Sequence, residues 1–141
     1  MLRSADLKND FPIDPVLPQG FDNTPNDARS KAELDAWWDR PFAVTNKDGS
    51  FSVRCLHGGA WDRSSWLGEA ATIDAARALG ESKLAEWQHT RAEPRITFVD
   101  GTLRIIRMPQ RPDQDEVLLG TASSQEEAKE FIKREFQPYI K

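Results

Sequence analysis

Cys55 and His57 come closer to a catalytic pair than any other residues of this sequence. They stand two positions apart on a predicted strand, so both side chains would share one face, as a thiolate and its base require. No third polar group is identifiable that would orient the imidazole, and Cys55 continues the apolar alternation of Phe51 and Val53. We therefore interpret Cys55 as a core residue and predict no catalytic residue, no cofactor and no enzymatic activity.

Metal binding has little support in the sequence. The nitrogen and sulfur ligands are His57, His89 and Cys55, and they lack the closely paired spacing of zinc sites. The His-Gly-Gly run at 57–59 lacks the glycine spacing and the lysine of a phosphate-binding loop, so it predicts a turn. We expect no metal site.

A more informative set of residues combines tryptophan with arginine in one connection of the first half of the chain. These residue types supply much of the binding energy in protein interfaces. We predict that Trp61, Arg63 and Trp66, with Arg54, form the contact patch for a protein partner. Core packing is the competing interpretation, and it fits Trp66 best, because the apolar Leu118 takes its place in the second half.

A competing site is basic. Between Arg91 and Arg111 there are five arginines and two acidic residues, which concentrates positive charge on one hairpin. Strands can lie in the major groove of DNA, where arginine reads guanine, so Arg95, Arg104 and Arg107 are the candidates for a nucleic-acid site. Strand alternation puts Arg104 and Arg107 on opposite faces, and solvated charges at a sheet edge explain these arginines equally well.

The charge distribution also disfavours a nucleic-acid partner. The formal net charge is -4, and residues 1–39 carry eight acidic and four basic side chains, so the rest is balanced. Affinity for nucleic acid is built mainly on cationic side chains that meet phosphates. We expect the acidic arm over residues 1–24 to be a second contact for the protein partner.

Size and composition bound the class of protein. A chain of 141 residues makes one domain, or two very small units that share a core. No apolar run approaches the roughly 20 residues that cross a bilayer, and no signal peptide is recognisable at the N-terminus. The one cysteine excludes an intramolecular disulfide and fits a reducing compartment, so we expect a cytoplasmic protein without a membrane partner.

A repeat organises the elements that position these residues. At an offset of 52 residues, Asp48-Gly49 matches Asp100-Gly101, and Leu67-Gly68 matches Leu119-Gly120. The match continues without a gap through residue pairs of similar type: Ala70 and Ala122, Thr72 and Ser124, Ala76 and Ala128, and Leu84 and Phe136. An ungapped series of this kind predicts an internal duplication.

Each repeat unit predicts the same elements. An Asp-Gly turn joins two strands into a hairpin, a third short strand ends at the Leu-Gly pair, and a helix starts at Thr72 or at Ser124. The predicted fold class is α+β, with tandem strand-strand-strand-helix units, antiparallel sheet and helices on one side. The predicted divisions are an extended acidic arm over 1–24, a leading helix over 25–39 that Thr24 caps and Pro25 begins, and units over 40–89 and 90–141 that share one core.

The second unit also carries Val99, Ile106 and Leu118 on the sheet face opposite its helix. A sheet that is apolar on both sides is usually covered on both sides. The other unit, the N-terminal arm and a second chain are the alternative covers, so a homodimer stays open as an interpretation.

Parts of the first unit resemble small uncharacterised proteins carried on bacterial mobile elements. The matching residues are Phe42-Ala43-Val44 through Asp48-Gly49, Val53-Arg54-Cys55-Leu56, Gly58-Gly59-Ala60-Trp61-Asp62-Arg63 and Trp66-Leu67-Gly68, about a third of the chain. The resemblance includes no catalytic motif and carries over no site residue. It implies an accessory or host-modulating role, such as the inhibition of a defence system by binding.

Overall fold

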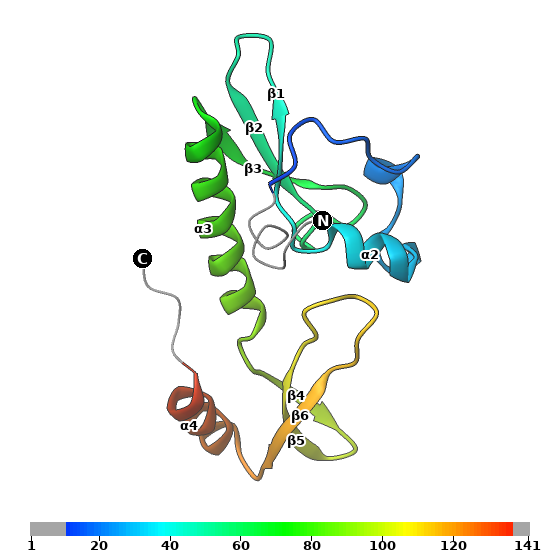
Figure 1. Ribbon diagram of the computed structural model, residues 1–141. Helices are drawn as coiled ribbons and strands as arrows, with labels where there is room; N and C mark the ends of the chain where they lie inside the picture. Colours follow the sequence, from blue (N-terminus) through cyan, green and yellow to red (C-terminus); the bar gives the residue numbers. More distant parts are fainter. Residues whose placement is uncertain (1–10, 137–141) are drawn as a thin grey trace, which may run out of the picture. The chain divides into compact units, whose positions relative to one another are not determined.

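The computed structural model describes residues 11–136, so the predictions for residues 1–10 and 137–141 lie outside it (Figure 1). The chain forms two compact units, one ending at Leu84 and the other beginning at Ala85. Each unit holds a three-stranded antiparallel sheet, and a helix follows the third strand. The predicted α+β fold class is therefore confirmed, with two separate sheets.

The first sheet is built from β1 (Phe42–Thr45), β2 (Phe51–Cys55) and β3 (Ser65–Ala70), with β2 in the centre. The predicted turn joins β1 to β2, and Gly49 has a φ of 88° there, which a side chain would strain. The Asp48 carboxylate accepts hydrogen bonds from the hydroxyl and the backbone N–H of the serine two positions later, and these bonds lower the pKa of Asp48. Local turn chemistry thus sets the register of the hairpin.

Helix α3 (Ile73–Arg91) packs on one face of this sheet. Its Ala76 is fully buried in a cluster with Ala43 and Val53 of the sheet and with Phe11 of the preceding segment.

No helix within the described part of the chain is long and apolar enough to cross a membrane.

The opposite face of the first sheet is covered by the chain that precedes it. Phe42 and Leu56 pack there against the buried ring of Phe21. The rings of Phe21, Trp37 and Phe42 meet edge to face, with centroid distances of 5.6 to 6.2 Å. Trp37 and Trp38 pack against this cluster as partly buried residues, so both belong to the core.

Helix α2 (Lys31–Trp37) is shorter than the helix predicted over 25–39, and it begins later. Pro25, the predicted first helical residue, has a ψ of 140°, outside the helical region. The helix starts after Ser30, whose hydroxyl accepts a hydrogen bond of 3.1 Å from the Glu33 N–H. The predicted cap before Pro25 was therefore wrong, although the serine and the glutamate three positions later form a capping-box sequence.

The predicted arm lies along β1 from Phe11 onward. The Ala43 N–H donates to the Pro12 carbonyl at 2.9 Å, and the Asp14 N–H donates to the Ala43 carbonyl at 2.8 Å. The Asp14 carboxylate accepts hydrogen bonds from the hydroxyl and the backbone N–H of Thr45, at 2.6 and 2.8 Å, and both lower its pKa. The arm therefore occupies the outer edge of β1.

The second sheet is built from β4 (Arg95–Val99), β5 (Thr102–Arg107) and β6 (Val117–Ala122), with β5 in the centre. Helix α4 (Gln125–Glu135) follows β6. As predicted, Ser124 caps this helix, and its hydroxyl accepts a hydrogen bond of 3.1 Å from the N–H three positions later.

The two units match residue for residue from the second strand of each, at the predicted offset of 52. Val53 pairs with Gly68 and Ile105 with Gly120, and the register shifts directly after each of these pairs. The helices α3 and α4 begin at equivalent residues, and each fully buries the alanine three positions further on. This common register supports the internal duplication, which stays a hypothesis about the origin of the chain.

The face of the second sheet opposite α4 is covered only in part. Ile106 is 4% exposed, whereas Val99 and Leu118 are 42% and 51% exposed. Within the residues that the structure describes, the centre of this face is therefore buried and its margins are exposed. The homodimer stays a prediction.

Candidate functional site

The predicted contact patch lies in and beside the connection from β2 to β3. Trp61, in the middle of that connection, is 61% exposed, and Trp66, on β3, is 57% exposed. The interpretation of Trp66 as a core residue was therefore wrong. Trp66 lies on β3, an edge strand, where it pairs with Arg54 of β2 and has no strand on its other side. The equivalent residue of the second unit, Leu118, is similarly exposed.

The preceding segment fixes the backbone of the connection. The Asn26 N–H donates to the Trp61 carbonyl at 2.8 Å, and the Asn26 side-chain amide donates to the Ala60 carbonyl at 2.9 Å. The Thr24 N–H donates to the Asp62 carbonyl at 3.1 Å. Three consecutive carbonyls of the connection are thus held by two residues, and Asn26 itself is buried.

A second anchor lies at the end of the connection, where Ser64 is buried. The Ser64 hydroxyl and backbone N–H donate to one carboxylate oxygen of Asp22, at 3.0 and 2.9 Å. The Arg54 guanidinium donates to the Ser64 hydroxyl at 2.9 Å and to the Ser64 carbonyl at 2.7 Å. Arg54, predicted as a contact residue, therefore positions the connection.

Arg29 in turn holds the anchoring residue Asn26. Its Nε donates to the Asn26 side-chain oxygen at 3.0 Å, and its terminal nitrogens donate to the Phe21 carbonyl at 2.8 Å and to the Glu33 carboxylate at 2.6 Å. The Arg29 side chain is fully buried, and its guanidinium carbon lies 5.0 Å from the centre of the Phe21 ring. This network links α2 to the connection that carries Trp61.

The sequence interpretation missed the four anchoring residues Asp22, Asn26, Arg29 and Ser64. The spacing of four residues between Arg29 and Glu33 was a readable signal for an ion pair, although Arg29 lies just before α2 and has an extended backbone. The bonds from Asn26 to Ala60 and from Ser64 to Asp22 join positions that are more than thirty residues apart. No local pattern encodes such bonds.

Arg63 and Asp62 form a pair beside Trp61 at the surface. The Arg63 Nε lies 2.9 Å from the Asp62 carboxylate. The hydrogen bond from Arg63 lowers the pKa of Asp62, and the same bond raises the pKa of Arg63. Because the pair is exposed, it adds little to the stability of the fold, and it leaves charged groups within reach of a partner.

Cys55 and His57 are both buried. Cys55 is fully buried, and its sulfur lies 3.8 Å from the Leu56 carbonyl oxygen. The His57 Nδ1 accepts a hydrogen bond of 3.0 Å from the Gly59 N–H, within the turn predicted at 57–59. Among the residues that the structure describes, no group of three or more histidine, cysteine or carboxylate side chains could hold a metal ion.

The structure does not bring the three candidate arginines of the second unit together. Arg95 pairs with Ile106, and Arg104 stands two positions before Ile106 on β5, so both lie on the face opposite α4. Arg107 lies on the other face and lines a pocket beside α4. These three arginines therefore do not form a single basic surface.

Comparison with protein-family models, with curated proteins and with solved structures found no match to this chain in any of the three.

Proposed function

We propose that the chain is a non-enzymatic binding module that docks a protein partner through Trp61, Arg63 and Trp66. The main support is that Trp61 is 61% exposed on a connection whose backbone is held by hydrogen bonds at three consecutive residues. Exposed aromatic side chains on positioned loops are a typical feature of binding surfaces.

The rigidity of the connection favours binding. Association normally costs free energy for the ordering of loops and side chains at the interface. Here Asn26, Ser64 and Arg54 already hold the backbone, so little ordering remains beyond the side-chain torsions of Trp61. Because the backbone is already ordered, only the loss of side-chain freedom would offset the burial energy of Trp61 on binding.

The magnitude supports Trp61 as the principal contact. A tryptophan buries 150 to 250 Å² in cores and interfaces, and burial contributes roughly 25 cal/mol per Å². With 61% of Trp61 exposed, covering it would contribute about 2 to 4 kcal/mol. This is the range of an interface hot spot.

The acidic arm over residues 1–24 has a narrower role in this proposal than the sequence suggested. Its Asp14 carboxylate holds Thr45 of β1, and its Asp22 carboxylate holds Ser64 at the end of the connection. These two groups therefore serve the fold. In this proposal, the other residues of the arm would make any contact with the partner.

The setting of this activity is also part of the proposal. We propose a cytoplasmic location, because the one cysteine, Cys55, is buried and forms no disulfide within the chain, as reducing compartments favour. The accessory or host-modulating role that the resemblance to mobile-element proteins implies stays a prediction.

The test is affinity capture from a host lysate with two matched double variants. Trp61→Ala with Arg63→Ala removes the proposed contacts, whereas Phe98→Ala with Arg95→Ala removes a similarly exposed aromatic residue and an arginine from the second unit. Circular dichroism should first show that both variants fold. We expect one specific protein to be captured by the wild type and the control and lost from the Trp61 variant. Equal capture by all three would contradict the proposal.

A heparin column separates this proposal from nucleic-acid binding. The arginines Arg95, Arg104 and Arg107 are split between two faces, and the net charge is -4, so we expect no retention at neutral pH. Retention that is lost on replacing Arg95 and Arg104 would instead favour a nucleic-acid site.

A further inference from the structure

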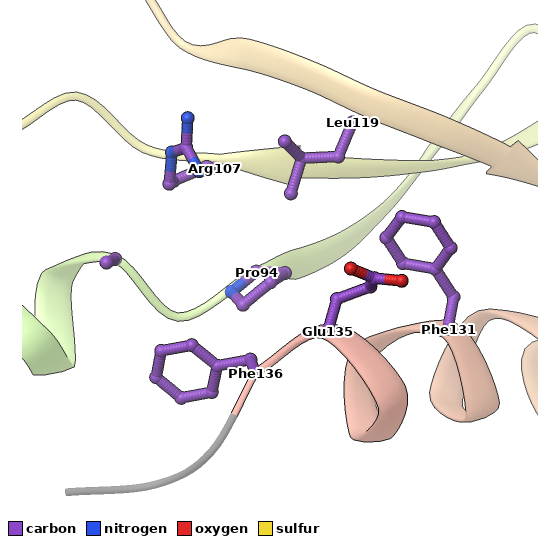
Figure 2. A pocket seen from close by; sticks show the side chains of 7 residues that line it. Pro94, Arg107, Leu119, Phe131, Glu135 and Phe136 are labelled. Carbon is purple, nitrogen blue, oxygen red and sulfur yellow. The ribbon is translucent and has the colours of Figure 1, made fainter.

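The second unit contains a pocket of about 260 Å³ between α4 and its sheet (Figure 2). Figure 2 shows Phe131 and Glu135 on α4, with Arg107 and Leu119 on the strands facing them. The pocket is separate from the patch around Trp61, which belongs to the first unit. The lining residues are Ala92, Pro94, Arg107, Leu119, Phe131, Glu135 and Phe136.

The pocket lies where the second unit packs less tightly than the first. In the first unit, a Cβ added at Gly68 would lie 2.9 Å from Leu79, so helix and strand are in close contact there. At the equivalent Gly120, the nearest atom is on Phe131, at 3.8 Å. The residue equivalent to Arg107 is Cys55, which is fully buried. A small core residue in one unit thus corresponds to a long cation in the other.

The polar groups of the pocket are one cation and one anion on an apolar background. Within residues 11–136, the Arg107 guanidinium makes no hydrogen bond or ion pair, and Glu135 has only its neighbour Arg134, at 3.9 Å. The Phe136 ring is stacked on His89 with a centroid distance of 4.9 Å, so this wall is fixed. Arg107 and Glu135 are both exposed to solvent at the mouth of the pocket, and the guanidinium can donate two parallel hydrogen bonds to a carboxylate.

We propose that this pocket binds a free amino acid with a large apolar side chain. The α-carboxylate would bind Arg107, the α-ammonium would bind Glu135, and the side chain would pack on Phe131, Phe136 and Leu119. A zwitterion satisfies both charged groups at once, which a simple anion or cation does not. A volume of about 260 Å³ lies just below the range for drug-sized ligands, which suits a ligand of this size.

The test uses L-phenylalanine as the probe, titrated into the ¹⁵N-labelled whole chain and followed by amide chemical shifts. Two analogues separate the charges, because 3-phenylpropanoate lacks the ammonium group and phenethylamine lacks the carboxylate. The variants Arg107→Gln and Glu135→Gln remove each protein charge with little change of shape. Arg104→Gln is the control, since it lies on the same strand and faces away from α4.

We expect saturable shifts at the pocket residues with L-phenylalanine, and at least tenfold weaker binding of either analogue. Arg107→Gln and Glu135→Gln should each weaken the binding of L-phenylalanine by a similar factor, and Arg104→Gln should leave this affinity unchanged. No saturable shift at the pocket with L-phenylalanine would overturn the proposal. Equal affinity for 3-phenylpropanoate would also overturn it, because it would show a simple carboxylate site. The amide spectra of the variants report their folding directly.

Discussion

The replacement Asn26→Ala tests whether the connection that carries Trp61 is anchored as described. It removes the side-chain hydrogen bond of 2.9 Å to the Ala60 carbonyl and leaves Arg29 Nε without its acceptor at 3.0 Å. A lost hydrogen bond costs about 0.5 to 1.5 kcal/mol, and a buried group left without a partner costs about 1 to 3 kcal/mol. Because Arg29 is buried and charged, we expect a total loss of about 2 to 4 kcal/mol.

The assay is urea unfolding followed by tryptophan fluorescence. Four of the five tryptophans, Trp37, Trp38, Trp61 and Trp66, belong to the first unit, so the signal reports mainly on the unit that carries the change. Asn23→Ala is the matched control, because Asn23 is an exposed asparagine in the same segment. Its replacement should change the free energy of unfolding by less than about 0.5 kcal/mol. Equal effects of the two replacements would refute the anchoring role of Asn26.

Three further predictions concern packing, pH and thiol access. Gly68→Ala should destabilise the first unit by about 1 to 3 kcal/mol in urea unfolding, because the added Cβ would lie 2.9 Å from Leu79 at a φ of 147°, whereas Gly120→Ala should cost clearly less. The lowered pKa of Asp14 means that its hydrogen bonds stabilise the fold above pH 3.8 and are lost as the pH falls through the lowered value. Asp14→Asn should therefore reduce the change in stability measured between pH 5 and pH 2, and an unchanged acid response would contradict this. Cys55 should react with a thiol reagent only after unfolding, and rapid reaction of the folded protein would disprove its burial.

Local patterns in the sequence were enough to predict most of the fold. The Asp48-Gly49 and Asp100-Gly101 turns, the strands around them and the cap at Ser124 each depend on residues close together in the chain. The start of α2 was also encoded locally, by Ser30 and Glu33, but the proline at position 25 gave a competing signal. That competition explains the one misplaced helix start.

The candidate site was predictable in its residue types and not in its geometry. The sequence indicated Trp61 and Arg63, yet the bonds that fix their connection come from Asn26 and Asp22, far away in the chain. Exposure of Trp66 depends on its place at the margin of an edge strand, which alternation alone does not reveal. Tertiary contacts of this kind are set by the whole fold.

The pocket of the second unit illustrates the same limit. The aligned repeat shows that Arg107 takes the place of Cys55, and this difference is readable from the sequence. Whether such a change fills the space or opens it depends on the separation of helix and sheet, which the contacts at Gly68 and Gly120 reveal. Side-chain volume alone does not determine that separation.

The most direct test of the central claim is the affinity of the purified partner for the wild type, for Trp61→Ala and for Phe98→Ala, measured by titration calorimetry. Removal of an interface hot spot costs 2 kcal/mol or more, so Trp61→Ala should weaken binding by about 30-fold or more, and Phe98→Ala should leave it unchanged. A loss of less than about twofold for Trp61→Ala would contradict the account, because the exposed indole would then take no part in binding.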